Sequence, residues 1–238
     1  MLENYKKHVA ERAEQNIPPL PLDADQTSEL IELLKKDHQE SDFLFDLLKE
    51  RVPAGVDQAA YVKAAFLADI TTGKASSPYI TKIDAVKILG TMLGGYNIQP
   101  LIECLKDNEL AEAAAHVLSR TLLIFDAFNE IFELSKTNEH AKKVVEEWAN
   151  ATWFTEKTDI EEQIKLTVYK VTGEINTDDL SPAPDAWSRP DIPLHALAMF
   201  KMPRTGLDDP LGTIEKLKEK GNPLVFVGDV VGTGSSDW

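Results

Sequence analysis

Apolar residues recur every three or four positions through most of residues 2–151, and this period predicts amphipathic helices. Clear stripes run through 30–34, 62–70 and 83–93. Short breaks separate the stretches, so each helix can bury its apolar stripe only against a neighbouring helix. We therefore predict stacked antiparallel helix pairs, a helical-repeat scaffold, although the letters themselves show no clear repeat.

Helix ends can be read from capping residues. Side-chain oxygens of Ser, Thr, Asp and Asn accept hydrogen bonds from the free N–H groups of a first turn. Glycine ends a helix because it adopts the left-handed conformation without strain. We expect N-caps at Asp23, Ser41, Asp57, Thr81 and Asn97, and helix ends near Gly73 and at Gly94–Gly95.

The pattern changes after residue 154. Residues 164–171 alternate apolar and polar positions, as a half-buried strand does, and 223–227 form a short apolar strand. Helices are expected from His195 and over about 211–220. We predict a helical domain over 1–158 and a mixed α/β region over 159–238.

Composition excludes several classes of protein. The formal net charge is -15, which disfavours a dedicated nucleic-acid binder. The N-terminus lacks an apolar signal core, and no apolar run is long enough to span a bilayer. Cys104 is the single cysteine, and the five histidines lack metal-ligand spacing, so we expect a cytoplasmic protein without a disulfide framework or a metal site of its own.

Three segments could carry chemistry. The glycine loop 228–236 follows a strand and could hold an anion with backbone N–H groups, or be a turn. The adjacent acids Asp178 and Asp179 could be a turn-and-cap device, which we favour, or hold a substrate or cation. Arg189, in a proline-rich loop, could clamp a carboxylate or form a surface ion pair with Asp185 or Asp191.

Long stretches of the chain resemble the bacterial B-type aconitases. The run from Thr172 to Met199, with the sequence TGEINTDDLSPAPDAWSRPDIPLHALAM, resembles the entry of that family's swivel domain. The stretches YKKHVAER (5–12), RVPAGVD (51–57) and GTMLGGYNIQP (90–100) resemble its N-terminal helical domain. GDVVGTGSS (228–236) resembles its substrate loop.

The resemblance implies a HEAT-like helical domain used for association, followed by an incomplete swivelling β/α domain. It also implies a part in aconitate hydratase, the hydro-lyase of the tricarboxylic acid cycle that interconverts citrate and isocitrate through cis-aconitate with a [4Fe–4S] cluster. Arg189, Ser235 and Ser236 would bind the substrate. A homodimer through the helical domain is implied as well, and so is RNA binding, which the net charge disfavours.

The departures from the family predict that this chain alone is inactive. Asp237 stands where the family has an arginine, and a carboxylate there repels a tricarboxylate. The cluster cysteines and the catalytic base of the family lie in later domains, so no catalytic residue, cluster or metal ligand is expected here. The alternative function is a non-catalytic helical module for protein interaction. We also expect residues 1–155 to fold stably and residues 160–238 to be partly disordered or poorly packed in a free monomer.

Overall fold

The computed structural model describes residues 1–238 except 16–18, 122–123, 125–126, 157–160, 186–194 and 234–238. The chain separates into two compact units. One holds Met1 and Leu22–Thr158, and the other holds Leu2–Pro21 and Asp159–Trp238. Residues 2–21 thus group with the C-terminal unit, and the expected domain boundary between 158 and 159 stays a prediction. In the described residues, helices precede a small mixed α/β region with parallel strands.

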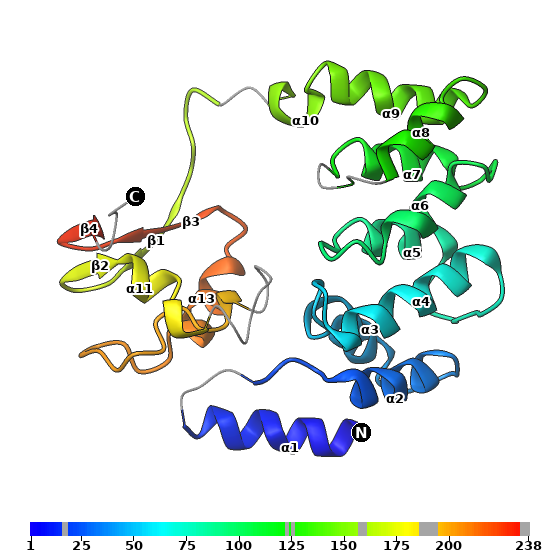
Figure 1. Cartoon of the computed structure of the whole chain (residues 1–238). Coiled ribbons are helices and arrows are strands. Elements are labelled where there is room, and N and C mark those ends of the chain that lie inside the picture. Colours follow the sequence, from blue (N-terminus) through cyan, green and yellow to red (C-terminus); the bar gives the residue numbers. More distant parts are fainter. Residues whose placement is uncertain (16–18, 122–123, 125–126, 157–160, 186–194, 234–238) are drawn as a thin grey trace. The chain divides into compact units, whose positions relative to one another are not determined.

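The helical unit is a series of short helices, each packed on others nearby in the sequence (Figure 1). The helix α4 packs against α2 and α5, α5 packs against α7, and α7 packs against α9. In the described residues the helices are α2 (Ala24–Leu34), α3 (Ser41–Glu50), α4 (Gln58–Thr72), α5 (Lys82–Leu89), α6 (Ile98–Cys104), α7 (Ala111–Leu118), α8 (Phe128–Leu134), α9 (Glu139–Ala149) and α10 (Thr152–Thr155).

Capping explains where several of these helices begin. Asp23 and Thr81 each form a capping box. The side chain of the cap residue accepts a hydrogen bond from the backbone N–H of the third helical residue, and the side chain of that third residue accepts one from the backbone N–H of the cap residue. Asp57 caps α4 through the amide of Ala60 at 3.1 Å, and Gly73 ends that helix with φ of 76°. These starts and this end confirm the sequence-based expectations.

Two expectations about helix ends were wrong, and a third holds only for the position of the cap. Ser41 is the first residue of α3 rather than its cap, and the side chain of Glu40 at the cap position does not bond the first turn. Asn97 is at the N-cap position of α6 as expected, but its buried side chain does not cap the helix, and its amide donates to the carbonyl oxygens of Leu89 and Met92. The helix α5 already ends at Leu89, before Gly94–Gly95.

The second unit contains two parallel strand pairs. The strand β1 (Thr167–Lys170) pairs with β3 (Leu224–Val227), and β2 (Glu174–Asn176) pairs with β4 (Val230–Thr233). The unit also contains α1 (Leu2–Ala13), α11 (Thr177–Leu180), the 3-10 turn Ala183–Asp185 and α13 (Pro210–Lys218).

An aromatic cluster forms the core of the α/β unit. Tyr169 on β1, Phe226 on β3 and Phe200 lie with ring centroids 5.4–6.3 Å apart. Val171, Ile175 and Ile214 complete the buried set, and Ile214 comes from α13. Burial raises the pKa of the Tyr169 hydroxyl, because its charged form loses hydration there. The cluster therefore joins both strand pairs to α13 and to the segment around Phe200.

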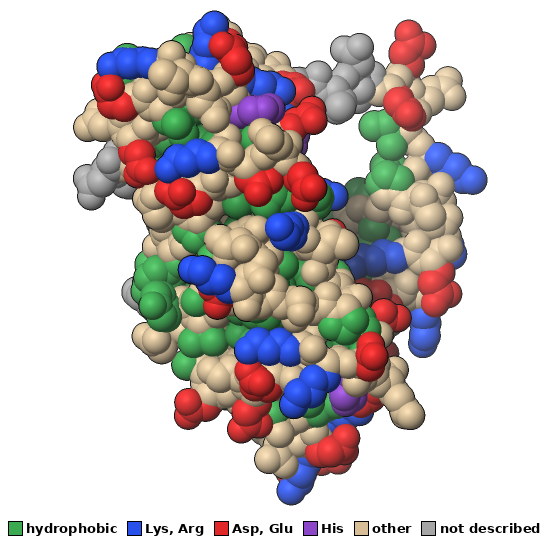
Figure 2. Space-filling model, turned by 90° about the vertical axis from the view of Figure 1, so that its right-hand side faces the viewer, with side chains coloured by type: hydrophobic (Ala, Val, Ile, Leu, Met, Phe, Trp, Pro, Cys, Tyr) green, Lys and Arg blue, Asp and Glu red, His purple; other side chains and the backbone are tan. Residues whose placement is uncertain are grey.

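The described surface is charged but mixed in sign. On the face shown in Figure 2, basic and acidic side chains lie interspersed rather than gathered by sign. Some charged side chains of the described helices pair with a residue three or four positions away, such as Lys35 with Glu32 and Lys106 with Glu103. No helix among the described residues has the length and apolar character that a membrane span requires.

Candidate functional site

The predicted substrate residues Arg189, Ser235 and Ser236 lie outside the described residues, and so does Asp237. The structure does describe the elements that precede Arg189 in the sequence and those that precede Ser235, Ser236 and Asp237. Strands β2 and β4 pair in parallel, with Asn176 opposite Thr233, so their carboxyl ends lie at one edge. The segment carrying Ser235 follows Thr233 directly, and α11 follows Asn176 directly. Carboxyl ends of parallel strands are the usual place for ligands in such sheets.

The glycine loop is anchored where it begins. The amide of Gly173 donates to the Asp229 carboxylate at 3.0 Å, and the amide of Asp229 donates to the Gly173 carbonyl at 2.8 Å. The Thr233 hydroxyl bonds the Glu174 carboxylate. The sequence predicted a loop over the whole of 228–236, but Val230–Thr233 is a strand. Its partner strand is β2, which the sequence analysis missed as well.

The adjacent acids Asp178 and Asp179 take different positions. Asp178 is exposed, whereas Asp179 closes the capping box of α11. Its Oδ2 accepts the Asn176 amide at 3.0 Å and Nη2 of Arg204 at 2.9 Å. The preferred turn-and-cap interpretation therefore holds for Asp179. Its ion pair with Arg204 had no signal in the sequence, because the two residues are far apart along the chain.

Two more side-chain pairs lie beside this one. Lys201 forms an ion pair with Asp185, one of the two acids expected as a partner of Arg189. The Ser181 hydroxyl lies 2.9 Å from Nε2 of His195. Sequence reasoning singled out neither Lys201 nor Arg204. Their position shortly after a proline-rich acidic loop is the one available signal, and it is weak.

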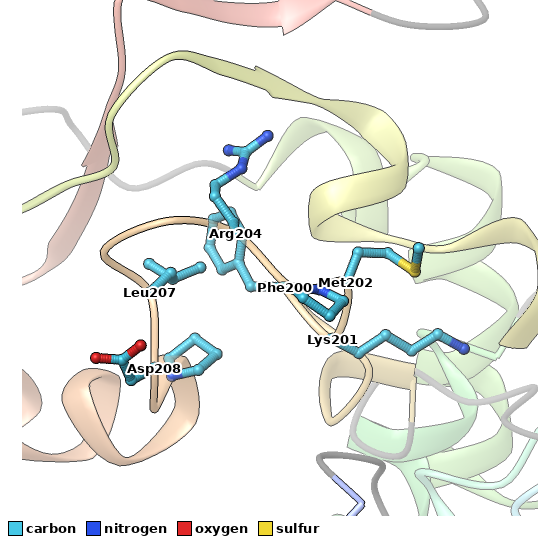
Figure 3. A pocket seen from close by; sticks show the side chains of 8 residues that line it. Phe200, Lys201, Met202, Arg204, Leu207 and Asp208 are labelled. Carbon is cyan, nitrogen blue, oxygen red and sulfur yellow. The ribbon is translucent and has the colours of Figure 1, made fainter.

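A cavity of about 330 Å³ lies next to these pairs. Lys201, Met202, Leu207 and Asp208 are among its lining residues. Figure 3 shows the Arg204 side chain turned away from Leu207 and Asp208. The guanidinium is thus used for the ion pair with Asp179 rather than presented beside the Asp208 carboxylate.

The comparison with protein families agrees with both parts of this architecture. A family described as the aconitate B N-terminal domain matches residues 4–154. The chain belongs to the aconitase B family. A second family, described as the aconitate hydratase 2 N-terminus, matches residues 166–237. The two matches cover the helical stretch and the α/β stretch in turn, which confirms the resemblance seen in the sequence.

Relatives in this family are similar to the chain over nearly its whole length. Aconitate hydratase B of Escherichia coli (strain K12) is 58% identical over 245 residues, and that of Synechocystis is 57% identical over 241. The protein of the same name from Helicobacter pylori (strain J99) is 50% identical over 237 residues. Each alignment covers 99% of this chain but only 27–28% of the relative. The chain thus spans little more than a quarter of the length of these aconitase B proteins.

An iron–sulfur cluster does not fit the thiol of this chain. Cys104 is 4% exposed, and burial raises its pKa against the weaker opposing effect of a hydrogen bond with Thr71. Cluster iron needs several thiolates, whereas Cys104 is the single cysteine and is held as a neutral thiol. In the part of the chain that the structure describes, His, Cys, Asp and Glu form no group of three suited to a metal ion.

Proposed function

We propose that residues 1–238 form the N-terminal part of an aconitate hydratase, supplying an association domain and part of the surface that binds citrate and isocitrate. The observation that carries the proposal is the family match across both units, with about half or more of the residues identical to aconitate hydratase B in three organisms. In this reading the helical unit is HEAT-like and residues 159–238 begin the swivelling β/α domain.

In this proposal Arg189, Ser235 and Ser236 bind the carboxylates of the substrate. A guanidinium can donate two parallel hydrogen bonds to one carboxylate, and serine hydroxyls can donate to another. The common carboxyl edge of β2 and β4 supports the part given to the two serines, because Ser235 follows Thr233 of β4 closely in the sequence. The anchoring of Gly173 to Asp229 supports it further, because it fixes the start of the glycine loop.

The chain on its own is proposed to be inactive. Dehydration of citrate or isocitrate to cis-aconitate needs a group that polarises the leaving hydroxyl of the substrate and a base that removes a proton. The buried Cys104 suits neither task, and we derive no step through a cluster. The contribution of these residues is to bind and orient carboxylates.

An activity assay and a binding assay together test the proposal. After anaerobic cluster reconstitution the chain alone should not convert isocitrate, and turnover above background would contradict the proposed division of roles. Citrate should shift amide resonances of the α/β unit in ¹⁵N-labelled chain. Arg189→Gln should weaken this binding at least tenfold, whereas Arg51→Gln in the helical unit should leave it unchanged. Equal binding by both variants would remove Arg189 from the site.

A second candidate function is association through the helical unit. Val56 and Leu93 are 74% and 73% exposed, and Tyr61 and Tyr96 stack edge to face nearby, with ring centroids 5.4 Å apart. The Tyr96 hydroxyl donates to the Val56 carbonyl at 2.9 Å, which holds this apolar patch together. Such patches favour protein contacts. The net charge of -15 argues against non-specific RNA as the partner.

Light scattering across a concentration series tests the association role. A monomer–dimer equilibrium is expected, which Leu93→Glu should shift towards the monomer because it places a charge in the patch. The matched control is Phe154→Glu, which places the same charge at another exposed apolar residue of the same unit. A monomer at all concentrations would contradict this second function and leave the substrate-binding role.

A further inference from the structure

Another cavity of the α/β unit is lined by α1, by Pro19 and by residues between 197 and 211. We call it the α1 cavity, and its volume is about 270 Å³. The described residues that line it all belong to one compact unit. We propose that the α1 cavity binds a small organic cation, which places an apolar body in the cavity and a primary ammonium group beside Asp208. The inference goes beyond the proposed function, because the substrates proposed there are anions.

The walls of the α1 cavity are mostly apolar. Val9 and Ala13 of α1 supply one part of the lining, and Leu197, Met199 and Leu211 supply another. Met199 and Leu211 also pack against the aromatic core, so the buried core supports this wall. An alkyl chain that enters such a cavity leaves water, and each methylene group that it buries favours binding.

The charged residues of the lining favour a cation. Asp208 and Asp209 are both exposed, and neither side chain forms an ion pair in the described part of the chain. Lys201 lines the cavity as well, but its charge is balanced by the ion pair with Asp185. The lining therefore carries more negative than positive charge, which attracts an ammonium group and repels a carboxylate.

The two acids of the lining have different surroundings. Asp209 caps α13, where its carboxylate accepts the Gly212 amide at 3.0 Å and lies at the positive end of the helix dipole. Asp208 has no such partner among the described residues, and Figure 3 shows Arg204 turned away from it. The carboxylate of Asp208 is therefore the group that an ammonium would meet.

The end of α1 acts in the same direction as Asp208. The helix ends at Ala13, which is part of the lining, and the C-terminal end of a helix carries partial negative charge. Arg12 lies in the same turn but is not among the described residues that line the cavity. The helix end thus adds to the attraction for a cation.

The size of the cavity restricts the ligand to a small molecule. A volume of about 270 Å³ is the room of about nine water molecules. A short alkyl chain fits this volume, whereas a peptide helix does not. Because Asp208 is exposed, the ammonium beside it keeps contact with water and avoids the cost of burying a charge. The occupant would contact α1 and residues 197–211 together, and so strengthen the attachment of α1 to the α/β unit.

Three probes with one alkyl chain and different head groups test the proposal: hexylamine, hexanol and hexanoate. Each is titrated into the whole ¹⁵N-labelled chain. The amides of Val9, Ala13 and Leu211 should shift, and that of Ala64 in α4 should not. Hexylamine should bind about threefold more tightly than hexanol, as expected for an exposed ion pair, and hexanoate should bind most weakly. Hexanoate binding as tightly as hexylamine overturns the proposal, and so does the absence of saturable shifts at these amides.

Two pairs of variants locate the site. Asp208→Asn should remove the preference for hexylamine and leave the binding of hexanol unchanged, whereas Asp178→Asn, at an exposed acid outside the lining, should keep the preference. Ala13→Phe should fill the cavity and abolish binding of hexylamine, and Ala10→Phe places the same ring on α1 outside the lining as its control. A preference that persists in Asp208→Asn, or unchanged binding in Ala13→Phe, overturns the proposal. The comparison of the three probes needs no substitution, so it decides even if a variant fails to fold.

Discussion

Asp229 and Gly173 hold each other through two reciprocal hydrogen bonds. The carboxylate of Asp229 accepts the Gly173 amide at 3.0 Å, and the Asp229 amide donates to the Gly173 carbonyl at 2.8 Å. Gly173 has φ of 85°, so the turn between β1 and β2 suits glycine. The relationship ties this turn to the start of the glycine loop.

Asp229→Ala should loosen this connection. Loss of a hydrogen bond with a charged acceptor should speed hydrogen exchange of the Gly173 amide about fivefold, which corresponds to about 1 kcal/mol. Asp208→Ala, at an exposed acid of the same unit, should leave that amide unchanged. Equal exchange rates in both variants would show that the carboxylate does not hold the turn in solution.

Asn97→Ala should destabilise the helical unit by about 2–3 kcal/mol, because two hydrogen bonds to carbonyls are lost in a buried position. The side chain of Asn97 is 1% exposed and donates at 2.8 Å and 3.1 Å to Leu89 and Met92. Urea unfolding followed by circular dichroism measures the change. Gln99→Ala, on the exposed side of α6, should change the stability by less than about 0.5 kcal/mol. A small effect at Asn97 would mean that water replaces the amide.

Gly94→Ala and Gly55→Ala should differ sharply although the two residues are neighbours in space. A Cβ on Gly94 would lie 1.9 Å from the Gly55 carbonyl oxygen, whereas a Cβ on Gly55 would meet nothing within 4 Å. We expect Gly94→Ala to cost about 1–3 kcal/mol, because backbone must move apart, and Gly55→Ala to be near neutral. Thermal unfolding of the two variants gives the comparison, and equal midpoints would contradict the close approach of these loops.

Thr81→Val should remove the capping box of α5 and change the response to acid. A hydrogen bond from the Thr81 side chain lowers the pKa of Asp84 below its ordinary value of 3.8. Stability from this bond is therefore complete above the unfolded pKa and is lost as the pH falls through the lower folded pKa. Unfolding at pH 7 should show a loss of about 1 kcal/mol relative to the unmodified chain. The difference should shrink below pH 3.8, and a constant difference would contradict the linkage.

Limited proteolysis compares the two units. We expect protection of residues 22–155 and early cleavage within 160–238. In the described part of the α/β unit the strands form two-stranded sheets, and Val168, Val230 and Val231 are about half exposed. Mass spectrometry of the fragments locates the cuts. Equal protection of 160–238 would contradict this expectation.

The sequence alone determined the helical unit and the family. A period of 3.6 residues and caps such as Asp23, Asp57 and Thr81 are local signals, because each residue contacts its own turn. The strands β1 and β3 were also readable from alternation and apolar runs. The long ordered match to the B-type aconitases needed no geometry at all.

Only the tertiary structure decided the surroundings of the candidate site. The sequence analysis recognised neither β2 nor β4, and the two strands pair with each other across a long stretch of chain. The pairs Asp179–Arg204 and Asp185–Lys201 likewise join residues that carry no mutual signal in the sequence. Phe200 is buried in the aromatic core, and its amide donates to the carbonyl of Asp179 in α11. The burial of Phe200 follows from the packing of apolar side chains and has no local signal in the sequence.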